Sequence, residues 1–171
     1  DTTWSRGLGD VYKRQPTNGQ ILINGNHVTI NNPREARSYG IGMVFQHFSL
    51  FPALTVSENI LISLDEKITK KHLEDKISIT AKQWGLPIEP TKKVLDLSVG
   101  EQQRVEIIRC LLQNPKLLIM DEPTSVLSPQ EINQLFKVLR KLANSGCSIL
   151  YISHKLNEIK QIASKVTILR S

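Results

Sequence analysis

LLIMDEPTSVLSP, residues 117–129, is the stretch of sequence that decides the fold. Four apolar residues end at Asp121, Glu122 follows directly, and a turn rich in proline and serine comes next. This pattern predicts a buried parallel strand that ends in two carboxylates at a nucleotide site. Asp121 would hold the water shell of Mg²⁺, and Glu122 would polarise an attacking water. Adjacent acids after an apolar strand also serve as plain helix N-caps in α/β folds, so this stretch alone leaves both interpretations open.

A second segment, LSVGEQQR at residues 97–104, predicts the start of a helix a short distance upstream. Ser98 is a favoured N-cap residue, and Glu101 three residues later completes a capping box. With the small Gly100 nearby, such a helix start offers free N–H groups and a positive dipole end to a phosphate. The same residues would also fit an ordinary capped helix.

Two further apolar strands are predicted, and each ends in one polar residue. Residues 39–46 end in Gln46, which a long loop follows, and residues 148–154 end in His154. A lone glutamine after a strand carries little information, and a single histidine at a strand end is usually structural. Their order along the chain, relative to the two segments above, is what gives them meaning.

Taken in order, these four segments resemble the motifs of an ABC-type ATPase cassette. Residues 97–104 resemble its LSGGQ signature, residues 117–124 its Walker B strand, residues 39–46 its Q-loop and His154 its switch histidine. The resemblance implies ATP and Mg²⁺ as cofactors. It implies catalytic roles for Glu122, His154 and Gln46, and it places Asp121 and Gln46 at the metal.

In the resembled family, two cassettes pair head to tail, and ATP lies between the P-loop of one and the signature of the other. The resemblance therefore implies that the signature residues bind nucleotide held by the partner cassette; these are Ser98, Gly100, Glu101 and Gln102. Asp121 would instead act on nucleotide held by its own cassette.

Three departures from the family pattern point to one branch. Val99 replaces the first glycine of LSGGQ, Glu101 replaces its final glutamine, and Ser128 stands where an aspartate is usual. The pattern looks most like the first cassette of the double-cassette ATPases that drive import of simple sugars or nucleosides. Not all sites in that branch are equally competent, so reduced activity is an expected possibility.

The P-loop string G-x-x-x-x-G-K-[ST] occurs nowhere in the sequence. Its backbone N–H groups and lysine would hold the phosphates. In family order it belongs upstream of Pro16, where residues 1–15 show neither helical nor strand periodicity. We therefore expect a cassette truncated at both ends, in which residues 1–15 are foreign or artefactual.

The expected fold is α/β: a P-loop NTPase-type cassette with a parallel core sheet, a small antiparallel part and an inserted helical subdomain. The α/β core would comprise residues 16–54 and 115–171, and the helical signature subdomain residues 55–114. A hairpin turn is predicted at Asn24-Gly25. A last strand is predicted at Lys165–Leu169.

Composition and charge restrict the class of protein. The 171 residues, 40% of them hydrophobic, suit a single domain, and no apolar run approaches the ~20 residues that cross a bilayer. The net charge of +6 is dispersed, so we expect no nucleic-acid partner. Cys110 and Cys147 lie in apolar surroundings, as expected for reduced core residues of a cytosolic protein.

The leading hypothesis is a fragment of the ATP-hydrolysing subunit of an importer for a small polar solute, such as a simple sugar or nucleoside. It would lie at the cytoplasmic side of the cell membrane and dock on permease subunits through residues 47–54. A second cassette and, indirectly, a solute-binding protein would be further partners. Phe48, Phe51 and Leu54 would equally suit the core.

Without a P-loop, the fragment itself would be inactive. Two alternative functions remain open from the sequence. One is a non-catalytic cassette that acts as a structural partner, and the other is a soluble ABC ATPase outside transport.

Overall fold

The computed structural model describes residues 18–64 and 68–169, and the chain divides into two units, residues 1–33 and 34–171. In the first unit, β1 (Ile21–Ile23) and β2 (Asn26–Val28) form an antiparallel hairpin. The turn residues between them, Asn24 and Gly25, have φ angles of 52° and 80°. A two-residue type I′ turn requires positive φ at both positions, so the predicted hairpin is confirmed.

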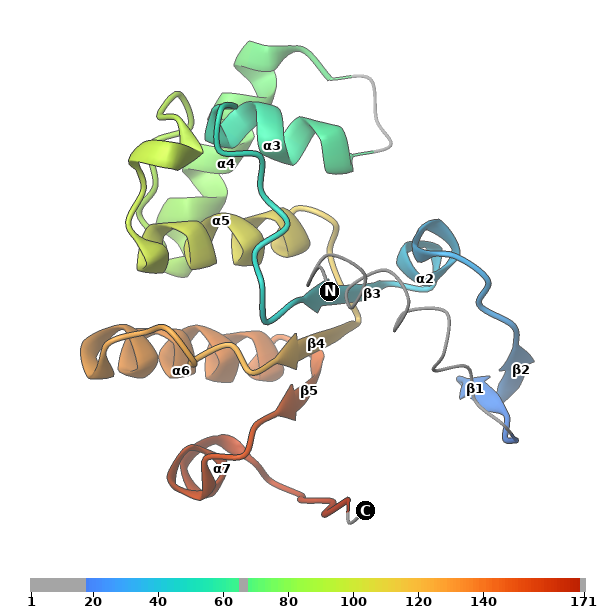
Figure 1. Cartoon of the computed structure of the whole chain (residues 1–171). Helices are drawn as coiled ribbons and strands as arrows, with labels where there is room; N and C mark the ends of the chain where they lie inside the picture. The colour runs from blue at the N-terminus through green and yellow to red at the C-terminus, as the bar shows by residue number, and fades with distance from the viewer. Residues whose placement is uncertain (1–17, 65–67, 170–171) are drawn as a thin grey trace, which may run out of the picture. The chain divides into compact units, whose positions relative to one another are not determined.

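The second unit is built on a three-stranded parallel sheet in the order β3-β4-β5 (Figure 1). These strands span Ile41–Val44, Leu117–Asp121 and Ser148–Ile152. Asp121 at the end of β4 pairs with Ile152 at the end of β5. Because neighbouring parallel strands point the same way, the residues that follow β4 and β5 emerge at one edge of the sheet. The predicted parallel core sheet is confirmed.

Three helices lie between β3 and β4 in the sequence: α3 (Val56–Ser63), α4 (Lys70–Trp84) and α5 (Val99–Leu111). They pack on one another around fully buried aliphatic side chains, which include Val56, Ile60, Leu73, Ile77, Val105 and Ile108. α4 ends at Gly85, whose φ of 68° is the left-handed conformation that glycine favours after a helix. These helices belong to the predicted helical subdomain, whose boundaries remain a prediction.

The remaining α-helices come directly before or after strands of the sheet along the chain. α2 (Pro33–Ser38) precedes β3, α6 (Pro129–Asn144) follows β4, and α7 (Leu156–Ile162) follows β5. One face of α6 is buried; its residues are Leu135, Phe136, Val138, Leu139 and Leu142. Among the helices in residues 18–64 and 68–169, none is long and apolar enough to cross a bilayer.

The strand predicted at Lys165–Leu169 is wrong. Residues 166–169 are irregular, and Val166, Ile168 and Leu169 are 58%, 73% and 92% exposed. A strand forms only when a neighbouring strand accepts and donates its backbone hydrogen bonds. Among the described strands, β5 pairs with β4 alone, and no described strand pairs with this segment. The alternating apolar residues alone therefore do not make this segment a strand.

The two cysteines are free and buried, in agreement with their predicted place in the core. Burial raises the pKa of the Cys110 thiol to about 11. Burial also raises the pKa of the Cys147 thiol. Because the thiolate is the reactive form, neither residue has the character of a nucleophile at neutral pH.

Candidate functional site

Glu122 leaves the end of β4 in an unusual backbone conformation. Its φ is 46°, in the left-handed region, where a residue with a side chain costs on the order of 1–3 kcal/mol. Its N–H donates to the carbonyl oxygen of Ile152 at 3.0 Å, which ties it to the end of β5. Backbone strain of this kind is frequent at functional sites. In this conformation the Glu122 carboxylate reaches His154, in the segment after β5.

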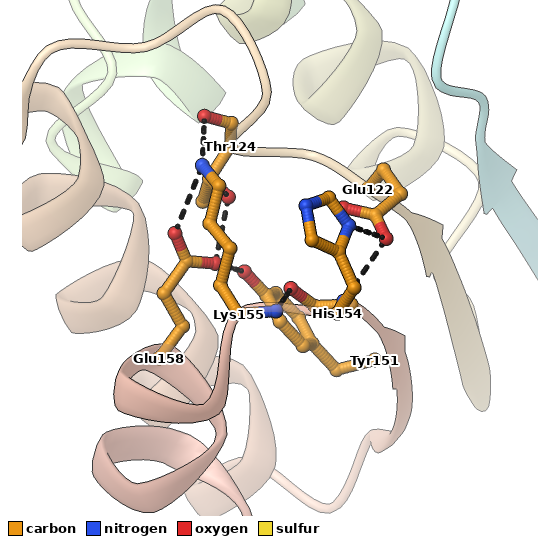
Figure 2. A network of polar contacts seen from close by, with 7 residues as sticks. Glu122, Thr124, Tyr151, His154, Lys155 and Glu158 are labelled. Carbon is orange, nitrogen blue, oxygen red and sulfur yellow. Dashed lines mark hydrogen bonds and ion pairs between the residues drawn. The ribbon is translucent and has the colours of Figure 1, made fainter.

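The structure brings Glu122 and His154 into direct contact (Figure 2). Glu122 Oε1 accepts the backbone N–H of His154 at 3.0 Å and lies 2.8 Å from its ring Nδ1. The Glu122 side chain is 16% exposed, whereas that of His154 is 78% exposed. Glu122 Oε2 is buried and accepts no hydrogen bond from the described residues. One oxygen is thus held in place, and the other is left with capacity for one more donor.

Beside this contact lies a second polar cluster, the Glu158 network, made of Thr124, Tyr151, Lys155 and Glu158 (Figure 2). Glu158 Oε2 accepts the hydroxyls of Thr124 at 2.6 Å and Tyr151 at 2.7 Å. Lys155 Nζ lies 3.3 Å from the other carboxylate oxygen and donates to the Thr124 carbonyl at 3.1 Å. Thr124 and Glu158 are both buried.

The pKa directions in the Glu158 network agree with its hydrogen bonds. Burial disfavours the Glu158 carboxylate, but hydrogen bonds from Thr124, Tyr151 and Lys155 outweigh it and hold the Glu158 pKa below its usual range. Burial, and then the contact with Glu158, raise the pKa of the Tyr151 phenol. Glu158 therefore stays ionised and accepts, while Tyr151 stays neutral and donates.

The sequence analysis missed this network. Its members are a threonine in a turn, a tyrosine in a strand, and a lysine and glutamate near a helix start, all of which are ordinary at such places. An acidic residue in the first turn of a short helix is normally explained by the helix dipole. Only the fold, which places the turn after β4 beside α7, shows that these groups meet.

The signature segment, residues 97–104, contains the predicted capping box at the start of α5. Ser98 Oγ accepts the N–H of Glu101 at 3.2 Å, and Glu101 Oε2 accepts the N–H of Ser98 at 2.8 Å. The bond from the Ser98 backbone, assisted by Lys92, holds the pKa of Glu101 below its usual value. Gln102 donates to the carbonyl oxygen of Leu97 at 3.2 Å. In the described residues, no hydrogen bond joins this segment to Glu122 or His154.

Gly100 is buried in the first turn of α5, against the start of α6. A Cβ at this position would overlap the Glu131 carboxylate, with Glu131 Cδ only 2.6 Å away. Glu131 accepts the N–H of Ser128 at 2.9 Å and completes the capping box of α6. The missing side chain therefore has a packing role here, while its contact with nucleotide stays a prediction.

Replacing Gly100 by Ala is expected to push Glu131 out of its capping position and lower the free energy of unfolding by about 1 kcal/mol. Urea unfolding measures the change. If the overlap is the cause, the Gly100→Ala/Glu131→Ala chain should be at least as stable as Glu131→Ala alone, because alanine favours a helix more than glycine does. A further loss in the double variant would contradict this explanation.

Gln46 lies shortly after β3, is exposed, and lines an open cleft of about 420 Å³. The cleft also takes in Val99 and Gln102 of the signature segment and Val126 from the turn after β4. The structure thus places Gln46 beside the signature segment. It shows no hydrogen bond between Gln46 and Asp121 among the described residues, so their shared metal role stays a prediction.

The loop after Gln46 is held by two buried polar side chains. Asn59 of α3 accepts the N–H of Phe51 at 2.7 Å and donates to its carbonyl oxygen at 3.0 Å. Glu106 of α5 accepts the N–H of Ser49 at 2.9 Å. Phe51 is 57% exposed, whereas Phe48 and Leu54 are half-buried. The sequence did not decide whether these three residues lie in the core or at the surface. In the structure only Phe51 is clearly at the surface.

The residues at the end of β4 fit one side of a magnesium–nucleotide site. The described residues contain no group of three or more His, Cys, Asp or Glu side chains that could hold a metal alone. Mg²⁺ bound with a nucleotide needs only one or two carboxylates, since phosphates and water complete its shell. Asp121, the last residue of β4, is one such carboxylate, and Glu122 follows it directly. The P-loop string, which would bind the phosphates, is absent from these residues. The residues present therefore fit only the part of the site that would hold the metal and the attacking water.

Comparison with known proteins identifies a family for this chain. The family model described as "ABC transporter" matches residues 11–125. The match starts within residues 1–15, which lie outside the described residues, so the expected foreign origin of that segment stays a prediction.

Relatives of this chain are import proteins. The nucleoside import ATP-binding protein NupA of Lactococcus lactis is 42% identical, over 91% of this chain and 32% of the relative. The ribose import ATP-binding protein RbsA of Caldanaerobacter subterraneus is 38% identical, over 99% of this chain and 35% of the relative. The chain thus spans about a third of the length of these relatives.

Solved structures show the same fold. The dimeric post-hydrolysis state of the ATP-binding cassette MJ0796, bound to ADP and Pi, has a TM-score of 0.70 and 26% identity. It aligns with 85% of this chain and 67% of that one. The ADP conformation of the cassette MJ1267 has a TM-score of 0.71 and 25% identity, over 85% of this chain and 63% of that one. Since the family model also covers more than half of the sequence, the chain belongs to the ABC transporter family.

Proposed function

We propose that this chain is part of the ATP-binding and ATP-hydrolysing subunit of an ABC importer. The observation that carries the proposal is the contact between Glu122 and His154. Glu122 directly follows β4, and His154 follows the neighbouring parallel strand β5. Ligands of open parallel sheets bind outside this edge, where the strands end. A carboxylate with one oxygen fixed and the other unpaired is suited to orient an attacking water.

The site residues would divide the work of phosphoryl transfer, which needs mainly positioning and charge stabilisation. Glu122 would polarise the attacking water, and the exposed His154 ring, held at Nδ1, would contact the γ-phosphate. Asp121 and Gln46 would hold Mg²⁺, which when bound neutralises charge on the phosphates. The signature residues would bind nucleotide held by a partner cassette; these are Ser98, Gly100, Glu101 and Gln102.

The proposed partners are a second cassette, paired head to tail, and the membrane permease subunits. The dimeric state of the similar cassette MJ0796 supports the first. The loop at residues 47–54 supports the second, because it presents the exposed Phe51 on a backbone that Asn59 holds from both sides. The subunit would then lie at the cytoplasmic face of the membrane, with a solute-binding protein as an indirect partner.

The proposed solute is a small polar molecule, a simple sugar or a nucleoside. This rests on relatives whose names state import of nucleosides and of ribose. The permease and binding protein, rather than the cassette, would make the choice among such solutes.

A second candidate is a non-catalytic cassette that serves as a structural partner. It would apply if the full-length parent also lacks the P-loop string, which is absent from these residues. By either proposal, the chain alone should not retain ATP, because the backbone N–H groups and lysine that hold the phosphates are missing.

The test is ATP-dependent uptake by the full-length parent protein, reconstituted with its permease in liposomes. Radiolabelled ribose and a radiolabelled nucleoside are offered separately. ATP or a non-hydrolysable analogue is supplied on the side of the membrane that the cassettes face. We expect uptake of one solute class with ATP only. Equal uptake with the analogue, or a parent that binds but does not turn over ATP, would favour the non-catalytic candidate.

A further inference from the structure

Glu158 is a buried carboxylate that the proposed chemistry does not use. It is 7% exposed, yet three donors converge on it: the Thr124 hydroxyl, the Tyr151 hydroxyl and Lys155 Nζ. Burying a charged carboxylate is costly unless hydrogen bonds and an opposite charge compensate. Glu158 has both the hydrogen bonds and the opposite charge that compensate its burial. We therefore ask what this buried carboxylate does for the geometry of the site.

The three donors come from the segments that carry the candidate catalytic residues. Thr124 lies two residues after Glu122, and Lys155 directly follows His154. Lys155 also bridges the two segments, since its Nζ contacts Glu158 and donates to the carbonyl oxygen of Thr124 at 3.1 Å. One carboxylate at the start of α7 therefore holds both loops at once (Figure 2).

The contact between Glu122 and His154 depends on that arrangement. His154 is 78% exposed on its side chain, so packing cannot hold it against Glu122. The 2.8 Å and 3.0 Å distances between them need the turn after β4 and the turn after β5 to keep one relative position. Besides the sheet and the bond from the Glu122 N–H to the Ile152 carbonyl, the Glu158 network joins these two turns in the described part of the chain.

We propose that Glu158 is a positioning residue, which sets the contact between Glu122 and His154 by holding Thr124 and Lys155. Its effect on hydrolysis rests on the proposed function, whereas its effect on the geometry does not. The two parts can therefore be tested separately.

The geometry is tested in this chain by amide hydrogen exchange, measured by NMR at His154, whose N–H donates to Glu122. Glu158→Gln keeps the shape but replaces one acceptor oxygen by a donor, and Thr124→Val removes the hydroxyl. Both are expected to speed exchange at His154 by at least about tenfold, relative to Ile60 in α3 as internal reference. Thr124→Ser, which restores the hydroxyl, should return the native rate.

Glu89→Gln is the matched control, because it makes the same chemical change at an exposed residue outside the network. It should leave exchange at His154 unchanged. Native exchange at His154 in Thr124→Val or Glu158→Gln would overturn the proposal. If Glu158→Gln does not fold, the Thr124→Val and Thr124→Ser pair decides the matter alone.

The effect on hydrolysis is tested in the full-length parent. Glu158→Gln is expected to lower kcat for ATP more than tenfold, with KM little changed, because the backbone N–H groups and lysine of a P-loop, which would hold the phosphates in the parent, lie outside the Glu158 network. Unchanged kcat together with faster exchange at His154 would refute the catalytic part only. A parent without ATPase activity would refute the proposed function and leave the exchange result standing.

Discussion

Replacing Glu122 by Gln in the full-length parent is expected to lower kcat for ATP hydrolysis by on the order of 10²–10⁴-fold while leaving nucleotide binding intact. The Gln amide oxygen can still accept the His154 N–H that Glu122 Oε1 accepts, so the loop keeps its place. It cannot take up the proton or polarise the water as a carboxylate does. Steady-state turnover and equilibrium binding of a fluorescent ATP analogue separate the two effects.

Glu89→Gln is again the matched control, because the residue is exposed and lies outside the site. Undiminished turnover in Glu122→Gln would refute the catalytic assignment of Glu122. A loss of binding together with turnover would instead show that the substitution disturbs the site as a whole.

Replacing Glu106 by Ala in this chain is expected to lower the free energy of unfolding by about 3–5 kcal/mol, the usual cost of removing one partner of a buried ion pair. Glu106 is 1% exposed on its side chain, and its partner Arg109 is 13% exposed. The substitution leaves the Arg109 charge buried without its carboxylate. It also leaves the Ser49 N–H without the acceptor that now lies at 2.9 Å. Urea unfolding followed by circular dichroism measures the loss.

A double variant identifies the cause of that loss. Glu106→Ala/Arg109→Met removes both charges, so it should recover part of the stability that Glu106→Ala loses. Lys70→Met is the control for an exposed ion pair, since Lys70 and Glu58 are 56% and 38% exposed on their side chains. It should have little effect. A loss below about 1 kcal/mol in Glu106→Ala would contradict the buried-pair explanation.

Local features of the fold were predictable because their causes are local. The apolar run that ends at Asp121 forms β4, and the turn at Asn24-Gly25 joins the hairpin. Ser98 and Glu101 form the predicted capping box at the start of α5. Hydrophobic periodicity, turn conformation and helix capping each depend on residues close together in the chain, so they can be predicted from the sequence.

The predicted strand at Lys165–Leu169 failed for the opposite reason. Its alternating apolar residues satisfy the local pattern, yet a strand depends on a neighbour that the pattern cannot supply. Among the described strands none pairs with it, and its side chains stay exposed.

By itself, the sequence determined most of the helices and strands, their order, and three residues at or just after strand ends, namely Asp121, Glu122 and His154. The tertiary structure alone decided that Glu122 contacts His154 and that Glu158 joins the two turns that carry them. It also decided that Gly100 makes room for Glu131. These contacts join residues about 30 apart along the chain, so they exist only once the parallel strands have aligned and α6 and α7 have packed.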